Sequence, residues 1–169
     1  ILPMLNKNVE SGSGETSGGL MLTGTLEEPL VDGSFNINNG TIKLKQMSTL
    51  IENIKMAVKF EGRRIRLEEM SAKIGPNGKL NANGTFALMN GDSTPYQLDV
   101  KADNVEIASP LFSGIINGKA AITHERNRPH IASEVRLDKV LINMPTIPEI
   151  KPGSSNIGLD IKIVLGPEI

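Results

Sequence analysis

The residues of this chain that could do chemistry begin with two histidines, His124 and His130, which share a polar stretch with Glu125. Imidazole and carboxylate groups can ligate a metal ion, but such a site needs a third ligand, and none stands out nearby. Polar residues between two strand-like runs are typical of an exposed loop. We therefore predict a loop here and no metal site.

Residues 75–79 resemble a phosphate-binding loop, since they contain two glycines and end in Lys79. The glycines lack the spacing of that loop, however, and Leu80 occupies the position where a serine or threonine would hold magnesium. A strand-like run follows, whereas a phosphate loop precedes a helix. The segment is better interpreted as a β-turn.

Other catalytic groups are equally hard to assemble. The chain contains no cysteine, which excludes a thiolate nucleophile and a disulfide framework. The adjacent carboxylates Glu27 and Glu28, and likewise Glu68 and Glu69, fall at turns or strand ends, where solvated charge is expected. Because no nucleophile, base and orienting residue come together, we predict that the chain is not an enzyme and uses no cofactor.

The composition excludes a further class of function. Aromatic residues make up 3% of the chain, with no tryptophan and one tyrosine, so stacking platforms for nucleic-acid bases are missing. The formal net charge is −1, and the lysines and arginines are scattered instead of clustered. This distribution lacks the basic footprint of nucleic-acid binding. We predict no nucleic-acid partner.

Alternation of aliphatic and polar residues is the dominant pattern, clearest in residues 54–60 and 79–88. A period of two predicts strands with one apolar and one polar face. Asn-Gly pairs at residues 39–40, 77–78, 90–91 and 117–118 indicate tight turns, the pair at 83–84 indicates a bulge or bend, and the helix-like stretch at 47–53 is short. We predict an all-β fold, an elongated, curved antiparallel or mixed sheet of about a dozen short strands with a hydrophobic concave face.

The chain divides into two parts by composition. Residues 6–19 are rich in glycine and serine, so we interpret residues 1–19 as a flexible N-terminal arm or linker and residues 20–169 as one β module. Within the module, Pro29, Pro95 and Pro129 precede similarly spaced apolar residues, which indicates a repeat of strand, turn and partner strand. Because an alternating run almost reaches the end of the sequence, we expect a piece of a longer protein.

The apolar face of such a sheet must be covered, and the alternating pattern is compatible with two kinds of cover. In a β-sandwich the face is a closed core beneath a second sheet. In an open, curved sheet the face is a groove that can hold acyl chains. The basic residues that alternate with the apolar ones, among them Lys59, Arg66 and Lys79, are expected on the solvent face in either case.

A family resemblance favours the groove. Residues 19–44 closely resemble the unit of TamB-like proteins in which a glycine-containing strand, a Pro-x-x-x-Gly segment, a second strand and an Asn-Gly pair follow one another. Residues 56–67 and 70–85 look like the hairpins that continue this unit, and residues 110–121 resemble a later crossover with spaced glycines. The resemblance covers residues 19–165 and extends to the wider AsmA-like group of envelope proteins.

The resemblance implies a long, taco-shaped sheet in the periplasm of a diderm bacterium, within a full-length protein anchored in the inner membrane. It implies that phospholipid moves along a hydrophobic groove between the inner and outer membranes, in support of outer-membrane biogenesis. The implied partners are phospholipid acyl chains, an outer-membrane barrel protein of the TamA or BamA type, and adjacent β modules of the same chain.

The groove would be lined by alternate aliphatic side chains. The lining residues that we expect are Val58, Phe60, Ile65, Leu67, Leu80, Phe86, Leu98, Val100, Val135, Leu137, Ile161 and Ile163. Bulges can change which alternate residues face inward from one strand to the next. Two other roles stay open: a structural or chaperone-like scaffold that pairs with strands of outer-membrane proteins during assembly or secretion, and a plain β-sandwich binding domain.

Overall fold

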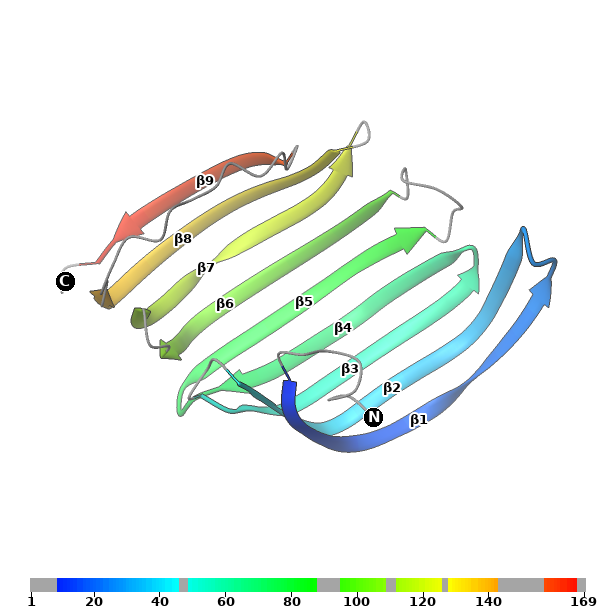
Figure 1. The fold of residues 1–169 in the computed structure, drawn as a ribbon, viewed down its shortest axis with the longest axis horizontal. Coiled ribbons are helices and arrows are strands. Elements are labelled where there is room, and N and C mark those ends of the chain that lie inside the picture. Colours follow the sequence, from blue (N-terminus) through cyan, green and yellow to red (C-terminus); the bar gives the residue numbers. More distant parts are fainter. Residues whose placement is uncertain are drawn as a thin grey trace.

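The computed structural model describes residues 9–45, 49–87, 95–108, 112–125, 128–142 and 157–166, which form one open, curled β-sheet (Figure 1). The sheet has nine strands, arranged side by side in the order in which they occur in the chain. The elements of these ranges are all strands, so this part of the chain offers no helix that could cross a membrane. The prediction of an all-β fold is confirmed.

The strands are long, and each pairs with the next one in sequence. Their bounds are β1 (Val9–Gly24), β2 (Pro29–Leu44), β3 (Ile51–Gly62), β4 (Arg64–Ile74), β5 (Gly78–Ala87), β6 (Tyr96–Ala108), β7 (Phe112–Glu125), β8 (Arg128–Ile142) and β9 (Gly158–Leu165). All pairs are antiparallel except β8 and β9, which are parallel. β1 and β9 are therefore the two edges of the sheet (Figure 1).

The strands are fewer and longer than the sequence predicts, because neighbouring alternating runs are joined. The runs on either side of Asn39-Gly40 are both part of β2, and this pair lies at a register shift instead of a turn. Asn117-Gly118 likewise lies inside β7, so the turn predicted there is wrong. Continuing the strand keeps the backbone groups paired with both neighbours, which a chain reversal at these positions would prevent.

Two other Asn-Gly pairs behave differently. Asn77-Gly78 is confirmed as a turn signal, since residues 75–77 form the turn between β4 and β5. Asn83-Gly84 pairs with β6 without a register shift, and the bulge expected at this pair lies on the facing strand β4, between Leu67 and Met70. The pair at residues 90–91 lies outside the described residues.

The sequence predicts a flexible arm up to residue 19, but residues 9–19 are part of β1. This strand is exposed almost throughout, so it is held by its backbone pairing with β2 and not by burial. Its glycines fit closely: a Cβ atom on Gly18 would overlap the carbonyl oxygen of Ser34. Residues 1–8 lie outside the described residues, as do residues 47–48 of the helix-like stretch, whose last three residues begin β3.

Bulges recur where a non-glycine residue has positive φ. These residues are Asn39, Asn53, Asn104 and Lys139, with φ angles between 51° and 55°. Asn39 and Lys139 occupy the same position after Pro29 and Pro129. Each copy of the predicted repeat is therefore one long, bulged strand and not a strand, a turn and a partner strand.

The residue after each of these bulges is buried. Gly40 follows Asn39, and Ile54, Val105 and Val140, which are 5%, 4% and 8% exposed, follow the others. A bulge inserts one residue into the strand and so changes the face that the next side chain occupies. With Ala72 and Ile74, these residues form a small core at one end of the sheet.

All the strands that the structure describes belong to this one sheet. No second sheet packs on its apolar side within the described ranges. The β-sandwich interpretation is therefore wrong for this part of the chain.

Candidate functional site

The strand register divides the sheet into two faces, since residues directly opposite each other in neighbouring strands point to the same side. We call one side the apolar face. One cross-strand row of this face consists of Gly18, Phe35, Val58, Leu67, Gly84, Leu98, Ile122, Ile131 and Leu159. The next row consists of Thr16, Ile37, Met56, Met70, Ala82, Val100, Ala120, Ser133 and Ile161. Neither row contains a charged residue.

The opposite side, the polar face, has a different composition. One of its rows consists of Ser71, Asn81, Lys101, Lys119, Glu134 and Lys162. Another contains Ser34, Lys59, Arg66, Thr85, Gln97, Thr123 and His130. The basic residues predicted on the solvent face, Lys59, Arg66 and Lys79, all lie here.

The structure brings every predicted lining residue onto the apolar face. Val58, Leu67, Leu98, Val100 and Ile161 belong to the two apolar rows above, and Phe60, Ile65 and Phe86 form a third row beside them. Leu80, Val135 and Ile163 share a fourth row, and Leu137 lies in a fifth, between Ile116 and Leu165. All the predicted lining residues therefore lie on the same side of the sheet in spite of the bulges.

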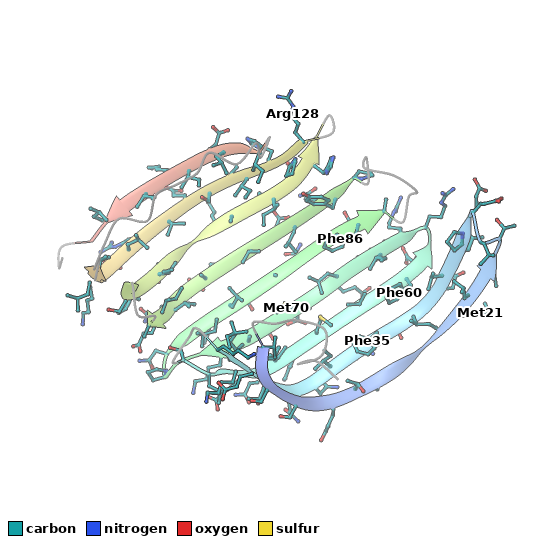
Figure 2. All side chains as sticks on the ribbon, viewed as in Figure 1. Met21, Phe35, Phe60, Met70, Phe86 and Arg128 are labelled. Atoms are coloured by element: carbon teal, nitrogen blue, oxygen red, sulfur yellow. The ribbon has the colours of Figure 1, made fainter. Side chains whose placement is uncertain are left out.

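The apolar face also contains residues that the prediction missed. Phe35, Met56 and Met70 continue the predicted rows, and Figure 2 shows Phe35, Phe60 and Phe86 spread across β2, β3 and β5. Tyr96 and His124 belong to the same side, opposite Phe86 and Pro129. Tyr96 alternates with Leu98, and His124 alternates with Ile122. This alternation is the sequence signal that could have predicted both residues on the apolar face.

The apolar face stays open at both edges. Leu20 and Leu22 in β1 are 57% and 72% exposed, and Ile161 and Ile163 in β9 are 51% and 58% exposed. Exposed contiguous apolar surface on this scale is typical of an interaction site. A hollow of about 1130 Å³ is lined by polar-face residues such as Asn81, Lys101 and Glu134 and also by Met70, Val100 and Val135 of the apolar rows.

Ion pairs cross the polar face from strand to strand. The Glu61 carboxylate lies 3.0 Å from both the Lys59 Nζ and the Arg66 Nη2 atoms, and the hydrogen bond from Lys59 lowers the pKa of Glu61. At the β8–β9 pair, the Lys162 Nζ lies 2.8 Å from the Glu134 Oε1. This hydrogen bond lowers the pKa of Glu134 and raises the pKa of Lys162. The charges thus satisfy one another on the side away from the apolar face.

The two histidines do not form a site. They lie in strands and not in the predicted loop, with His124 on the apolar face of β7 and His130 on the polar face of β8. The Nε2 atom of His130 lies 3.0 Å from the Asp160 Oδ2 atom. No cluster of three or more histidine, aspartate or glutamate residues that could hold a metal ion occurs in the described ranges.

Comparison with known proteins identifies the family. The family described as the TamB C-terminal domain matches residues 66–168. The chain belongs to the TamB family. Within this TamB-family chain, the match covers the strands from β4 to β9, which carry most of the apolar rows.

Two relatives of this TamB-family chain are much longer proteins. The translocation and assembly module subunit TamB of Haemophilus influenzae is 32% identical over 156 residues, which cover 80% of this chain and 12% of that protein. The rice protein SUBSTANDARD STARCH GRAIN 4, chloroplastic, is 27% identical over 120 residues, which cover 70% of this chain and 6% of that protein. The chain thus spans a small fraction of these relatives. No solved structure matches it.

Proposed function

We propose that this TamB-family chain is a non-catalytic section of an envelope protein that carries phospholipid acyl chains between the inner and outer membranes and so supports outer-membrane biogenesis. The observation that carries the proposal is the apolar face, whose rows run from β1 to β9 and stay open at both edges. An acyl chain is the ligand that such a surface suits best, because it needs apolar contact and no polar partner.

The energetics favour transport over tight capture. Apolar contact contributes about 25 cal/mol per Å² of surface buried, with no preferred direction. A fatty chain that moves along a row, from one strand to the next, exchanges one set of apolar contacts for a similar set, so its free energy stays nearly constant between β1 and β9. The face therefore supports sliding without demanding a particular acyl chain.

The full-length protein, in this proposal, lies in the periplasm and is anchored to the inner membrane. The name of the Haemophilus relative, a translocation and assembly module subunit, supports a role in translocation and assembly. At the open edges, β1 and β9 present unpaired backbone groups that adjacent β modules of the same chain can extend. A barrel protein of the TamA or BamA type is the proposed partner at the outer membrane.

The two faces of β3 provide the test. A photo-crosslinking amino acid is placed at Val58 on the apolar face or at Lys59 on the polar face of the full-length protein, in cells whose phospholipids are labelled. We expect phospholipid adducts at Val58 and not at Lys59. Equal labelling at the two positions, or labelling at neither, would contradict the proposal.

The same open edges favour a second candidate, a scaffold that holds strands of outer-membrane proteins by backbone pairing. Leu137→Asp separates the two, because Leu137 lies on the apolar face of β8, which is paired on both sides. The substitution is expected to abolish lipid adducts while strand pairing at β1 and β9 continues. Loss of protein assembly with lipid adducts retained would favour the scaffold.

A further inference from the structure

One end of the apolar face is aromatic, and the opposite end is aliphatic. Phe60 pairs with Ile65, Ile65 with Phe86, and Phe86 with Tyr96, so these side chains follow one another across β3 to β6. The rings of Phe86 and Tyr96 are stacked, with centroids 6.3 Å apart. The row at the other end of the strands consists of aliphatic residues such as Ile51, Ile74, Ile116, Leu137 and Leu165.

Two residues with hydrogen-bonding groups, Tyr96 and His124, also lie at the aromatic end of the apolar face. Tyr96, the single tyrosine of the chain, contacts His124 edge to face, with ring centroids 5.2 Å apart. The Nε2 atom of His124 is buried and has no hydrogen-bond partner among the residues that the structure describes. A buried imidazole nitrogen without a partner is unfavourable, so this position suits a ligand that brings a hydrogen-bonding group to it.

The length of the apolar face along the strands can be compared with the length of an acyl chain. Along β5, the apolar face extends about 27 Å from Phe86 to Gly78, at about 3.4 Å per residue. The hydrocarbon of one membrane leaflet is about 15 Å thick, half of the bilayer core. An acyl chain of that length that starts at the aromatic end therefore ends near the middle of the face, in the row of Met70, Ala82 and Val100.

We propose that phospholipids lie on the apolar face in one orientation, with their phosphate and ester oxygens at Tyr96 and His124 and their acyl chains extending along the strands to the row of Met70, Ala82 and Val100. This inference rests on the proposed function and specifies the orientation of the ligand. The phosphate and ester groups offer mainly acceptor oxygens, and the tyrosine hydroxyl and an imidazole N–H are donors. Amphipathic aromatic rings occupy the same level in membranes, between hydrocarbon and headgroups.

The orientation can be mapped with two photoactivatable phosphatidylglycerols, one with the reactive group in the headgroup and one with it at the end of an acyl chain. Each is bound to the full-length protein, irradiated, and its adducts are located by peptide mass spectrometry. We expect the headgroup probe to label the row of Phe60, Phe86 and Tyr96, and the tail probe to label the row of Met70, Ala82 and Val100. Headgroup adducts spread equally over both ends would overturn the orientation, and absence of adducts on the apolar face would overturn the proposed function as well.

A variant tests the two polar residues directly. The double substitution Tyr96→Phe and His124→Phe leaves an aromatic ring at both positions and removes the hydrogen-bonding groups. We expect headgroup labelling to fall roughly fivefold, the effect of losing about one hydrogen bond, while tail labelling is retained. Ser133→Ala, which removes a hydroxyl from the middle of the same face, is the matched control and should change neither. Unchanged headgroup labelling in the double variant would overturn the assignment.

Inorganic phosphate separates a lipid headgroup from a free anion. Because the acyl chains provide most of the binding energy in this proposal, added phosphate is expected to leave the headgroup adducts in place. Displacement by phosphate alone would show an anion site independent of lipid and would overturn the proposal.

Discussion

At the scale of single residues, the side of the sheet that a side chain occupies determines its surroundings. Val58 and Lys59 are neighbours in β3, but Val58 lies opposite Leu67 and Lys59 opposite Arg66. The first contributes to an apolar row and the second to an ion pair with Glu61. Substitutions at adjacent positions are therefore expected to have unrelated effects.

Val58→Asp is expected to reduce phospholipid binding by roughly tenfold or more, because a bound acyl chain would bury an unpaired charge. The fold should survive, since Val58 is only partly buried in the absence of ligand. The measurement is the yield of lipid adducts in the full-length protein, with circular dichroism as the test of folding. Ser34→Asp, on the polar face opposite Lys59, is the control and should bind lipid normally.

The ion pair between Glu134 and Lys162 predicts a pH dependence for the attachment of β9. The pKa of Glu134 is lowered in the folded state, so the contribution of the pair is present above the ordinary glutamate pKa of 4.5 and is lost as the pH falls through the lowered value. The pKa of Lys162 is raised, so the same contribution is lost as the pH rises above the ordinary value of 10.5 and through the raised one.

Hydrogen-exchange protection of the β9 amides, corrected for the intrinsic effect of pH on exchange, measures this dependence. Protection should be greatest between the ordinary glutamate pKa of 4.5 and the ordinary lysine pKa of 10.5, and it should decrease at lower and at higher pH. In Lys162→Met the loss of protection at low pH should be weaker, because Glu134 no longer accepts a hydrogen bond from the Lys162 ammonium group. A profile identical to that of the unsubstituted protein would contradict the assigned cause.

At the scale of elements, close strand contacts explain why glycine occupies the middle of central strands. A Cβ atom on Gly84 would overlap the carbonyl oxygen of Gln97 and lie 3.1 Å from the Cα of Leu98. On Gly118 it would overlap the carbonyl oxygen of Glu134 and lie 2.9 Å from the Cα of Val135. Backbone atoms are involved in both cases, so rotation of a side chain cannot relieve the overlap.

Gly84→Ala is expected to lower the free energy of unfolding by about 1–3 kcal/mol, the usual cost of inserting an atom into a packed region. Urea denaturation followed by circular dichroism provides the measurement. Gly19→Ala, in the edge strand β1, is the matched control because no atom lies within 4 Å of the added Cβ, and its effect should stay within about 0.5 kcal/mol. Equal losses for the two variants would argue against the close contact.

The positive-φ bulges are the second feature of the elements. Asn53 has a φ of 51°, a left-handed conformation in which other L-residues are strained by about 1–2 kcal/mol. Asn53→Ala should therefore destabilise the protein by about 1 kcal/mol, whereas Asn53→Gly should cost little. Asn83→Ala is the control, since Asn83 is exposed in β5 and is not among the residues with positive φ. Thermal unfolding should rank the variants in this order.

At the scale of the whole molecule, β1 and β9 are the edges of the sheet within the described residues, and the apolar face is still exposed there. Leu22 in β1 is 72% exposed and Ile163 in β9 is 58% exposed. The matching regions form only 12% of the Haemophilus relative and 6% of the rice relative. Both facts are consistent with a longer sheet in which the apolar rows continue beyond this chain.

Produced as a separate protein, this chain is expected to self-associate, because two open edges and an uncovered apolar face both favour contact with a second copy. Sedimentation velocity in detergent-free buffer should show species larger than the monomer. A mild detergent should shift the distribution towards the monomer by covering the apolar face. A stable monomer without detergent would contradict the exposure of this face.

Much of the candidate site could be predicted because side-chain alternation is a local property. Runs such as residues 54–60 place alternate residues on opposite sides of a strand whatever the strand pairs with, so the predicted lining residues share a face. Tyr96 and His124 continue the alternation, but an apolar pattern does not select them because both carry polar groups. The sequence overestimates the strand count because Asn-Gly pairs also occur inside strands, as in β2 and β7.

The sequence by itself determined the all-β class, the two-sided character of each strand and the family. Only the tertiary structure showed that the described strands form a single sheet, that Asn39, Asn53, Asn104 and Lys139 form bulges, and that Tyr96 meets His124. The physical reason is the range of the interactions. Alternation is fixed within a few residues, whereas a bulge or a ring contact depends on which distant strand supplies the backbone hydrogen bonds and on the register in which it pairs.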